Sequence, residues 1–289
     1  MFLQKNIVRC AFFEYIYLIS VGSIKFILFI MDKKLVSIIT PMYKGAAFIG
    51  ETIRSVQAQS YPYWEMIIVD DCSPDDGAGV AEVKKYAETD KRIRLIESKR
   101  NNGSSGSRNI ALRTAIGRYI AFLDSDDIWH ADFLKKQLTF MQQKNASLVF
   151  SSYRRIEEYT KEELLKPFIV PAKVNYRSLL KTCPIFPSTA IYDTEKTPKI
   201  LFNENLGSMR DDYVYWLTML KSIDYGFGNK DVLVDYRMRK SSVTGNKMKV
   251  IKPQWNVLYK VEKIGFIPSV YNIICWGFIS LGKYYLSRK

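Results

Sequence analysis

Three carboxylates stand within four residues at Asp124, Asp126 and Asp127, directly after an apolar run that predicts a buried strand over residues 119–123. Carboxylates this close repel one another unless a cation or hydrogen-bond donors neutralise them. Mg²⁺ and Mn²⁺ take oxygen ligands, and Mg²⁺ combines one or two carboxylates with waters and substrate phosphates. We therefore expect a divalent metal, Mn²⁺ or Mg²⁺, beside a phosphate site at Asp124-Ser125-Asp126-Asp127. The alternative is a solvated acidic turn that caps a helix beginning at Asp132.

Two further polar clusters follow predicted strands. Pro41-Met42-Tyr43 follows the strand predicted over residues 35–40, which we expect Pro41 to stop, and Asp70-Asp71 follows residues 65–69. A carboxylate in this place can accept hydrogen bonds from a base or a ribose hydroxyl, and a tyrosine ring can stack on a flat base. The alternatives are a helix-capping aspartate and a core tyrosine.

The elements that must position these residues alternate regularly. Apolar runs predict strands, and stretches with apolar residues at helical spacing predict helices. Such alternation predicts an α/β fold with a parallel sheet, in which ligands bind beyond the carboxyl ends of the strands, so the three clusters should converge. The predicted strands are 35–40, 65–69, 93–97, 119–123 and 147–152, and the predicted helices are 48–59, 79–89, 107–115 and 132–144.

A segment rich in small residues, Asn101 to Asn109, opens the helix predicted over residues 107–115. Backbone N–H groups at such a helix start can approach an anion, and Arg108 can add a charge-assisted contact to a diphosphate. The segment is neither G-x-G-x-x-G nor a P-loop, which argues against a dehydrogenase or an NTPase.

The pattern weakens after residue 155. We expect a helix over 211–221, a short strand over 232–236, a basic loop over 237–248, and a helical segment over 253–286 that Pro268 breaks or kinks. Asp211 and Asp212 open the first of these helices, and by themselves they indicate acids stabilised by the helix dipole.

The composition excludes several other classes of site. The chain has one histidine and four cysteines without a C-x-x-C pair, which argues against a zinc site and fits reduced thiols in the cytoplasm. The formal net charge is +14, and residues 230–289 carry nine more basic than acidic residues. This excess indicates an anionic partner, either a phosphorylated ligand, nucleic acid or an anionic membrane, or a solvated basic face.

Both ends of the chain could contact a membrane. Residues 1–30 resemble a signal anchor interrupted by Glu14 and Lys25, or an untranslated leader before a start at Met31, which is our preferred interpretation. The apolar segment 266–281 has basic flanks, so it predicts an interfacial helix or a helix packed on the domain. We expect a cytoplasmic protein at the inner face of the membrane.

Taken together, the motifs resemble the family 2 glycosyltransferases of the GT-A fold, and most closely the bacterial cell-surface polysaccharide branch of the teichuronic acid, capsule or O-antigen type. The resemblance covers about residues 35–245 and departs from the family at Lys44, where asparagine is common. The matching stretches are Val36 to Tyr43, Glu65 to Ser73, Ser107 to Asn109 and Gly117 to Trp129.

The resemblance implies roles for the matching residues. Tyr43 would stack on the nucleotide base and Asp71 would hydrogen-bond it, with Asp70 beside it. Asp124 and Asp126 form the D-x-D pair around Ser125, Asp126 would approach the ribose and the metal, and Asp127 would share the coordination. The implied domains are a nucleotide-binding half over about 31–130, an acceptor half over about 131–245 and a helical tail over 246–289.

The family also implies a carboxylate base and an inverting single displacement. Asp212 matches the base best because it lies four residues before Trp216, and Asp211 is the rival. The basic segment from Tyr236 to Lys247 would close over the diphosphate. The donor would be a nucleotide-diphosphate sugar, most simply a UDP-sugar, and the acceptor a growing or lipid-linked glycan; no nucleic-acid partner is expected.

Two other classes compete with this interpretation. A sugar-nucleotidyltransferase also combines a doubly wound sheet with Mg²⁺, but the chain lacks a glycine-rich, arginine-containing loop after its first strand. A non-enzymatic anion-binding or membrane-binding protein would account for the charge but not for the acidic strand ends.

Overall fold

The computed structural model describes residues 34–206, 210–238 and 247–286. One mixed sheet runs through this part of the chain, with β7 (Glu163–Phe168) pairing with β6 and β8 (Lys173–Val174) pairing with β10 off its main path. The strand order is β3 (Ile93–Glu97), β2 (Trp64–Asp70), β1 (Val36–Met42), β4 (Tyr119–Phe122), β9 (Ala190–Asp193), β6 (Leu148–Glu157), β10 (Gly226–Met238) and β5 (Ile128–Trp129).

The predicted α/β fold is confirmed, and its parallel strand pairs lie in the first half of the chain and between β6 and β10. β3, β2, β1 and β4 lie next to one another in this order, and all three pairs among them are parallel. β9 lies antiparallel between β4 and β6, which joins the two predicted halves into one sheet. Its four residues are all buried, and this short strand falls in a stretch for which the sequence predicted no element.

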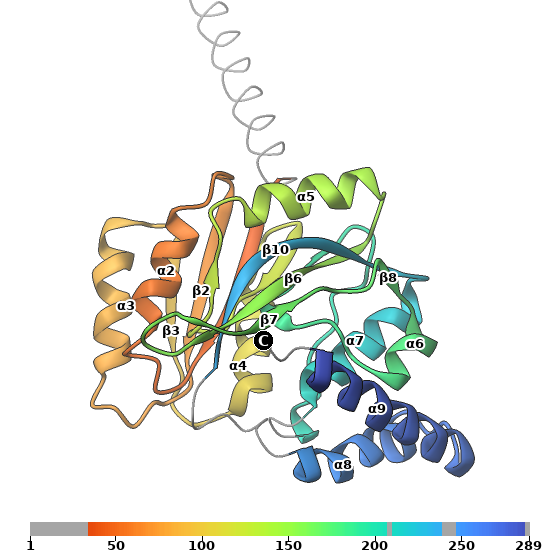
Figure 1. Cartoon of the computed structure of the whole chain (residues 1–289). Coiled ribbons are helices and arrows are strands. Elements are labelled where there is room, and N and C mark those ends of the chain that lie inside the picture. The colour runs from red at the N-terminus through yellow and green to blue at the C-terminus, as the bar shows by residue number, and fades with distance from the viewer. Residues whose placement is uncertain (1–33, 207–209, 239–246, 287–289) are drawn as a thin grey trace, which may run out of the picture.

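Helices cover both faces of the sheet (Figure 1). Alternate strand residues point to opposite faces, so Ile38 and Ile68 join one core while Ile39 and Ile67 join the other. The first core includes residues of α2 (Ile49–Gln57), α3 (Ala78–Thr89) and α5 (Phe133–Gln143), and the second includes residues of α4 (Gly103–Thr114), α6 (Tyr176–Lys181) and α7 (Asp211–Ser222).

Two predicted boundaries near the site were wrong. α4 begins at Gly103 rather than Ser107, so most of the segment rich in small residues is helical. β1 continues through Pro41 to Met42. Pro41 pairs only with Val69 of β2, because the β4 ladder ends at Ile39, and a proline is tolerated where no hydrogen bond is required of its nitrogen.

The C-terminal segment is helical, as predicted, but its break is elsewhere. α8 (Lys247–Asn256) continues into a π-helical turn, Val257–Val261, and α9 spans Phe266–Leu286. The chain turns at Lys263 and Gly265, which have φ angles of 52° and 92°. Pro268 lies in the first turn of α9, where its missing N–H costs no helical hydrogen bond, so the prediction that Pro268 interrupts the helix was wrong.

The basic segment after Tyr236 is not wholly a loop. β10 extends to Met238, so Tyr236 and Arg237 belong to the sheet. The rest of the predicted basic loop falls on residues 239–246, outside the described residues, as does the predicted N-terminal leader or anchor. Within the described ranges, no helix is long and apolar enough to cross a membrane.

Candidate active site

The carboxyl ends of β1 and β2 meet as predicted. The backbone nitrogen of Asp71 donates to the carbonyl of Met42 at 2.9 Å, and its Oδ1 accepts from the backbone nitrogen of Asn102 at 2.8 Å. Asp71 therefore ties the end of β1 to the start of α4. Asp70 is also buried and accepts from the Ser73 hydroxyl at 2.6 Å, which shapes the turn after β2.

Tyr43 projects from the end of β1 with 44% of its surface exposed. This exposure rules out a core position and leaves the ring available to a flat ligand. The next residue, Lys44, has a φ of 54° and places its amine 5.5 Å from the centre of the Tyr43 ring. Asparagine adopts such a left-handed conformation more readily than lysine, so this departure from the family pattern costs backbone strain.

Arg108 joins the acidic loop, Asp124-Ser125-Asp126-Asp127, to the start of α7. Its side chain is 7% exposed, and its two terminal nitrogens lie 2.6 Å from Asp124 Oδ1 and 3.3 Å from Asp211 Oδ2. Burial alone would lower the pKa of Arg108, but Asp124 and Asp211 raise it, so the guanidinium stays charged. In this structure Arg108 holds two carboxylates together; a direct contact with a diphosphate stays a prediction.

Ser188 and Arg237 anchor the acidic loop, a role for which the sequence did not single them out. The Ser188 hydroxyl accepts from the backbone nitrogen of Asp124 at 3.1 Å and donates to Asp127 Oδ2 at 2.5 Å. Arg237 donates from its backbone nitrogen to Asp127 Oδ1 and from Nε to the carbonyl of Asp126. Arg237 is 3% exposed and also pairs with Glu51, so it supports the loop.

Asp127 differs from its two acidic neighbours because its side chain is fully buried. Burial raises the pKa of its carboxyl well above the ordinary value, and the nearby Asp126 and Asp124 raise it further. Both of its oxygens accept hydrogen bonds from the protein. These contacts support the loop, and a share of Asp127 in metal coordination stays a prediction.

Asp124, Ser125 and Asp126 form the partly exposed rim of the loop. The carbonyl of Ser125 accepts from Thr52 Oγ1 at 3.0 Å, which fixes the backbone of the rim. Within the described ranges, no three His, Cys, Asp or Glu side chains are gathered as a ready metal cluster. Asp124 and Asp126 would offer a metal two carboxylates, and Mg²⁺ typically combines one or two carboxylates with waters and substrate phosphates.

The two aspartates at the start of α7 have different surroundings. Asp211 is buried, and its Oδ2 accepts from Ser104 and Ser105 at 2.9 and 2.8 Å in addition to Arg108. Asp212 is partly exposed and accepts from the backbone nitrogen of Tyr213. Desolvation raises the pKa of Asp212, and the adjacent Asp211 raises it further. This combination of access and raised pKa suits a general base.

Ser188 offers a direct test of how the loop is held. Changing Ser188 to Ala should lower the free energy of unfolding by about 1–3 kcal/mol, because it leaves one oxygen of the buried Asp127 carboxyl without a partner. Urea unfolding measures the change. Ser151→Ala is the matched control, because the Ser151 hydroxyl is buried and has no hydrogen-bond partner among the residues that the structure describes. Equal effects of the two substitutions would show that Ser188 does not anchor the loop.

The chain matches known proteins along most of its length. The profile of "Glycosyl transferase family 2" matches residues 37–196. The putative teichuronic acid biosynthesis glycosyltransferase TuaG of Bacillus subtilis is 36% identical over 257 residues, which cover 89% of this chain and 98% of TuaG. The UDP-Glc:α-D-GlcNAc-diphosphoundecaprenol β-1,3-glucosyltransferase WfgD of Escherichia coli is 37% identical over 233 residues, 79% of this chain and 87% of WfgD.

Solved structures share the fold at lower identity. Residues 1–349 of Staphylococcus aureus TarS, solved with UDP, align with a TM-score of 0.59 and 21% identity, covering 78% of this chain and 65% of that one. The mannosyltransferase PcManGT of Pyrobaculum calidifontis, solved with GDP-Man and Mn²⁺, aligns with a TM-score of 0.60 and 19% identity, covering 87% and 71%. These matches confirm the GT-A fold.

The family match decides between the classes that the sequence left open. It argues against a sugar-nucleotidyltransferase and against a protein without catalytic activity. The chain belongs to glycosyltransferase family 2 and is a glycosyltransferase of the GT-A fold.

Proposed function

We propose that the chain transfers a sugar from a UDP-sugar, with inversion and with the help of a divalent metal, to a hydroxyl of a growing or lipid-linked cell-surface glycan. The observation that carries this proposal is the Arg108 bridge. It places the acidic loop at Asp124 beside Asp211 and therefore beside Asp212 at the start of α7. One buried arginine thus links the loop that we propose binds the donor to the helix that carries the candidate base.

The proposal of a UDP-sugar donor is supported by the residues at the ends of β1 and β2. Tyr43 is exposed enough to stack on a base, while Asp70 and Asp71 are buried at the end of the neighbouring strand. WfgD is named for a UDP-Glc donor and TarS was solved with UDP, whereas PcManGT was solved with GDP-Man. These neighbours favour a nucleotide-diphosphate donor, and the two UDP examples favour uracil.

The proposal of a divalent metal is supported by the partly exposed rim of the acidic loop. Asp126 and Asp124 would hold Mn²⁺ or Mg²⁺, since both are partly exposed oxygen donors next to the expected diphosphate. When bound, the metal would supply positive charge that stabilises the leaving diphosphate. Arg108 offsets part of the acidic charge, and Asp127 holds the loop through its hydrogen bond with Ser188.

In the displacement itself, Asp212 would take the proton of the acceptor hydroxyl as that oxygen attacks the anomeric carbon. The bond from this carbon to the diphosphate oxygen breaks through an oxocarbenium-like transition state. One carboxylate base on the acceptor side is enough for this single displacement, and no covalent intermediate is formed. Asp211 would position Asp212, because its own oxygen is held by Ser104, Ser105 and Arg108.

The acceptor and the location belong to the same proposal. WfgD is named for a diphosphoundecaprenol-linked acceptor. α9 exposes an apolar stripe of Ile267, Tyr271, Ile274 and Phe278, spaced so that they share one helix face. Such a face supports peripheral association with a membrane, and we place the protein at the cytoplasmic face.

The experiment that tests this function is release of the nucleotide diphosphate by the purified chain from a panel of UDP-, GDP- and dTDP-sugars, with Mn²⁺, with Mg²⁺ and with EDTA. We expect release from one or a few UDP-sugars, and only when metal is present. Release of inorganic diphosphate from a sugar phosphate and UTP would instead identify a nucleotidyltransferase.

The pH dependence tests the base separately. A base works only when it is deprotonated, so kcat/KM should fall as the pH drops through the pKa of Asp212. That pKa is raised above the ordinary value of 3.8 by desolvation and by Asp211, so the acid limb should lie above this value. The limb should disappear in the residual activity of Asp212→Asn. A limb that survives would point to another group, such as Asp127, whose pKa is also raised.

A further inference from the structure

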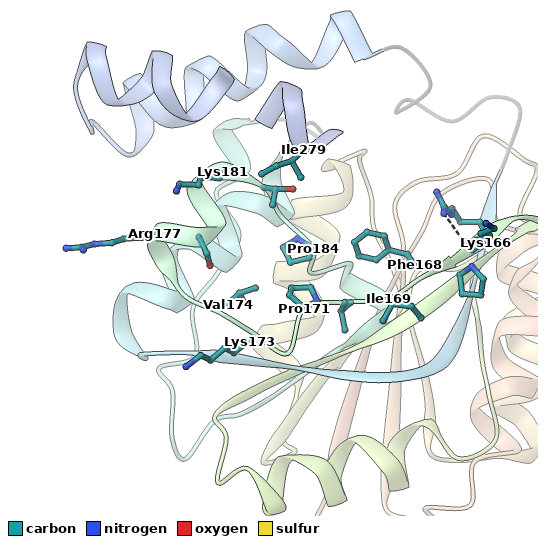
Figure 2. Close-up of a pocket in the computed structure, with 15 residues that line it drawn as sticks. Lys166, Phe168, Ile169, Pro171, Lys173, Val174, Arg177, Lys181, Pro184 and Ile279 are labelled. Carbon is teal, nitrogen blue, oxygen red and sulfur yellow. Dashed lines mark hydrogen bonds between the residues drawn. The ribbon is translucent and has the colours of Figure 1, made fainter. Parts of the chain in front are cut away.

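A cavity of about 810 Å³ lies between the β7–β8 connection, α6 and α9. Figure 2 shows Ile279 of α9 on one side of it and Phe168, Pro171 and Pro184 in its middle. Its size falls within the range of small-molecule sites. The apolar lining residues are Pro167, Phe168, Ile169, Val170, Pro171, Val174, Pro184 and Ile279.

The charged residues of this cavity all have one sign. No carboxylate lines it, and none of its cations forms an ion pair within the part of the chain that the structure describes. Figure 2 shows Lys173, Arg177 and Lys181 at one end and Lys166 at the other. The five cations are Arg155, Lys166, Lys173, Arg177 and Lys181.

Arg155 gives a second indication of a binding site. One of its terminal nitrogens donates to the carbonyl of Lys166 at 2.9 Å, but its Nε is buried and has no hydrogen-bond partner within the described residues. A buried donor without a partner is costly, so it marks a place where an acceptor atom of a ligand would be stabilising.

Two chain segments connect residues of the cavity with the supports of the acidic loop. Arg155 is in register with Tyr236 of β10, and the next residue, Arg237, holds the backbone of Asp126. Pro184, which also lines the cavity, lies a short segment before Ser188, and Ser188 anchors Asp124 and Asp127. A molecule in the cavity could therefore present an attached group toward the donor site.

We infer that this cavity binds the diphosphate and the first isoprenoid units of a prenyl-diphosphate-linked acceptor. The cations would meet the diphosphate, and the apolar lining would bury the start of the chain. The remaining chain would leave along α9, whose exposed stripe of Ile267, Tyr271, Ile274 and Phe278 is itself apolar. This inference rests on the proposed function, because it names the surface that recognises the acceptor.

The test is calorimetric binding of farnesyl diphosphate to the full chain with the donor site saturated by UDP and Mn²⁺. We expect farnesyl diphosphate to bind at least about tenfold more tightly than inorganic diphosphate or farnesol, because only it uses both halves of the cavity. Equal binding of inorganic diphosphate, or binding only to phosphatidylglycerol vesicles, would overturn the inference.

Two matched double variants locate the binding. Lys166→Gln with Arg177→Gln removes two exposed cations of the cavity and should weaken farnesyl diphosphate binding by roughly 10- to 100-fold. Lys135→Gln with Lys144→Gln removes the same charge from α5 and its C-terminal end, at the far side of the molecule (Figure 1), and should leave it unchanged. Equal effects of the two pairs would reduce the binding to general electrostatics and overturn the inference.

A third variant tests the apolar lining of the cavity. The cavity proposal and the proposed function can also fail separately. Ile169→Asn changes a side chain that is 53% exposed, so the fold should survive while binding weakens. If nucleotide sugars turn over but the cavity variants use a lipid-linked acceptor as well as the wild type does, the cavity proposal fails and the proposed function stands. If farnesyl diphosphate binds as expected but no sugar donor turns over, the proposed function fails.

Discussion

Changing Asp212 to Asn will lower kcat for sugar transfer by roughly 10²- to 10⁴-fold, the range expected when a general base is lost, while the dissociation constant of the donor stays nearly constant. We expect this loss because of where Asp212 lies. Asp212 is the partly exposed member of the α7 pair, its pKa is raised by desolvation, and its contact with the Tyr213 backbone is local. Steady-state rates of transfer and calorimetric donor binding give the two quantities.

Asp211→Asn is the matched control for this prediction. Asp211 holds Ser104, Ser105 and Arg108, so its change should lower the free energy of unfolding by about 1–3 kcal/mol and reduce kcat less than Asp212→Asn does. A larger fall in kcat for Asp211→Asn, in a variant that remains folded, would move the base to Asp211.

Changing Asp126 to Ala will lower kcat/KM by at least about 10³-fold, because the leaving diphosphate loses charge stabilisation of the kind that costs several kcal/mol to remove. The fold should survive, since the Asp126 side chain is at the partly exposed rim and its backbone carbonyl still accepts from Arg237. Turnover measured across a Mn²⁺ titration, with thermal unfolding alongside, separates the two effects.

The matched comparison is Asp127→Asn, which keeps the shape of a residue that the protein itself holds through Ser188 and Arg237. We expect it to lower stability more than Asp126→Ala does and to shift the Mn²⁺ dependence less. Full turnover of Asp126→Ala, or of the wild type in excess EDTA, would contradict the metal assignment.

The sequence predicted the first half of the fold well because its signals there are local. The strands around Ile38, Ile67 and Ile120 are nearly continuous apolar runs, and the helices between them have apolar residues at helical spacing. Parallel topology then places Tyr43, Asp71 and Asp124 at one edge of the sheet without further information. Motif resemblance suggested the base on α7, which spacing alone would have described as a pair of capping acids.

The supports of the site could not be predicted, because they come from contacts between distant parts of the chain. Ser188 reaches Asp127 across 61 positions, and Arg237 reaches it across 110. The sequence predicted no element near Ser188, so there was no reason to place this serine beside the acidic loop. The joining role of Arg108 is of the same kind, since its partner Asp211 is 103 positions away.

The decisive test of the proposed transfer is the structure of the product formed on a synthetic prenyl-diphosphate-linked sugar acceptor. The purified chain, Mn²⁺ and a panel of UDP-sugars are incubated with this acceptor, and the product is analysed by mass spectrometry and NMR. We predict that one donor adds a single sugar with inverted anomeric configuration, and that Asp212→Asn, folded and able to bind UDP, forms almost none. No added sugar with any donor, retention of configuration, or undiminished product with Asp212→Asn would contradict the proposed function.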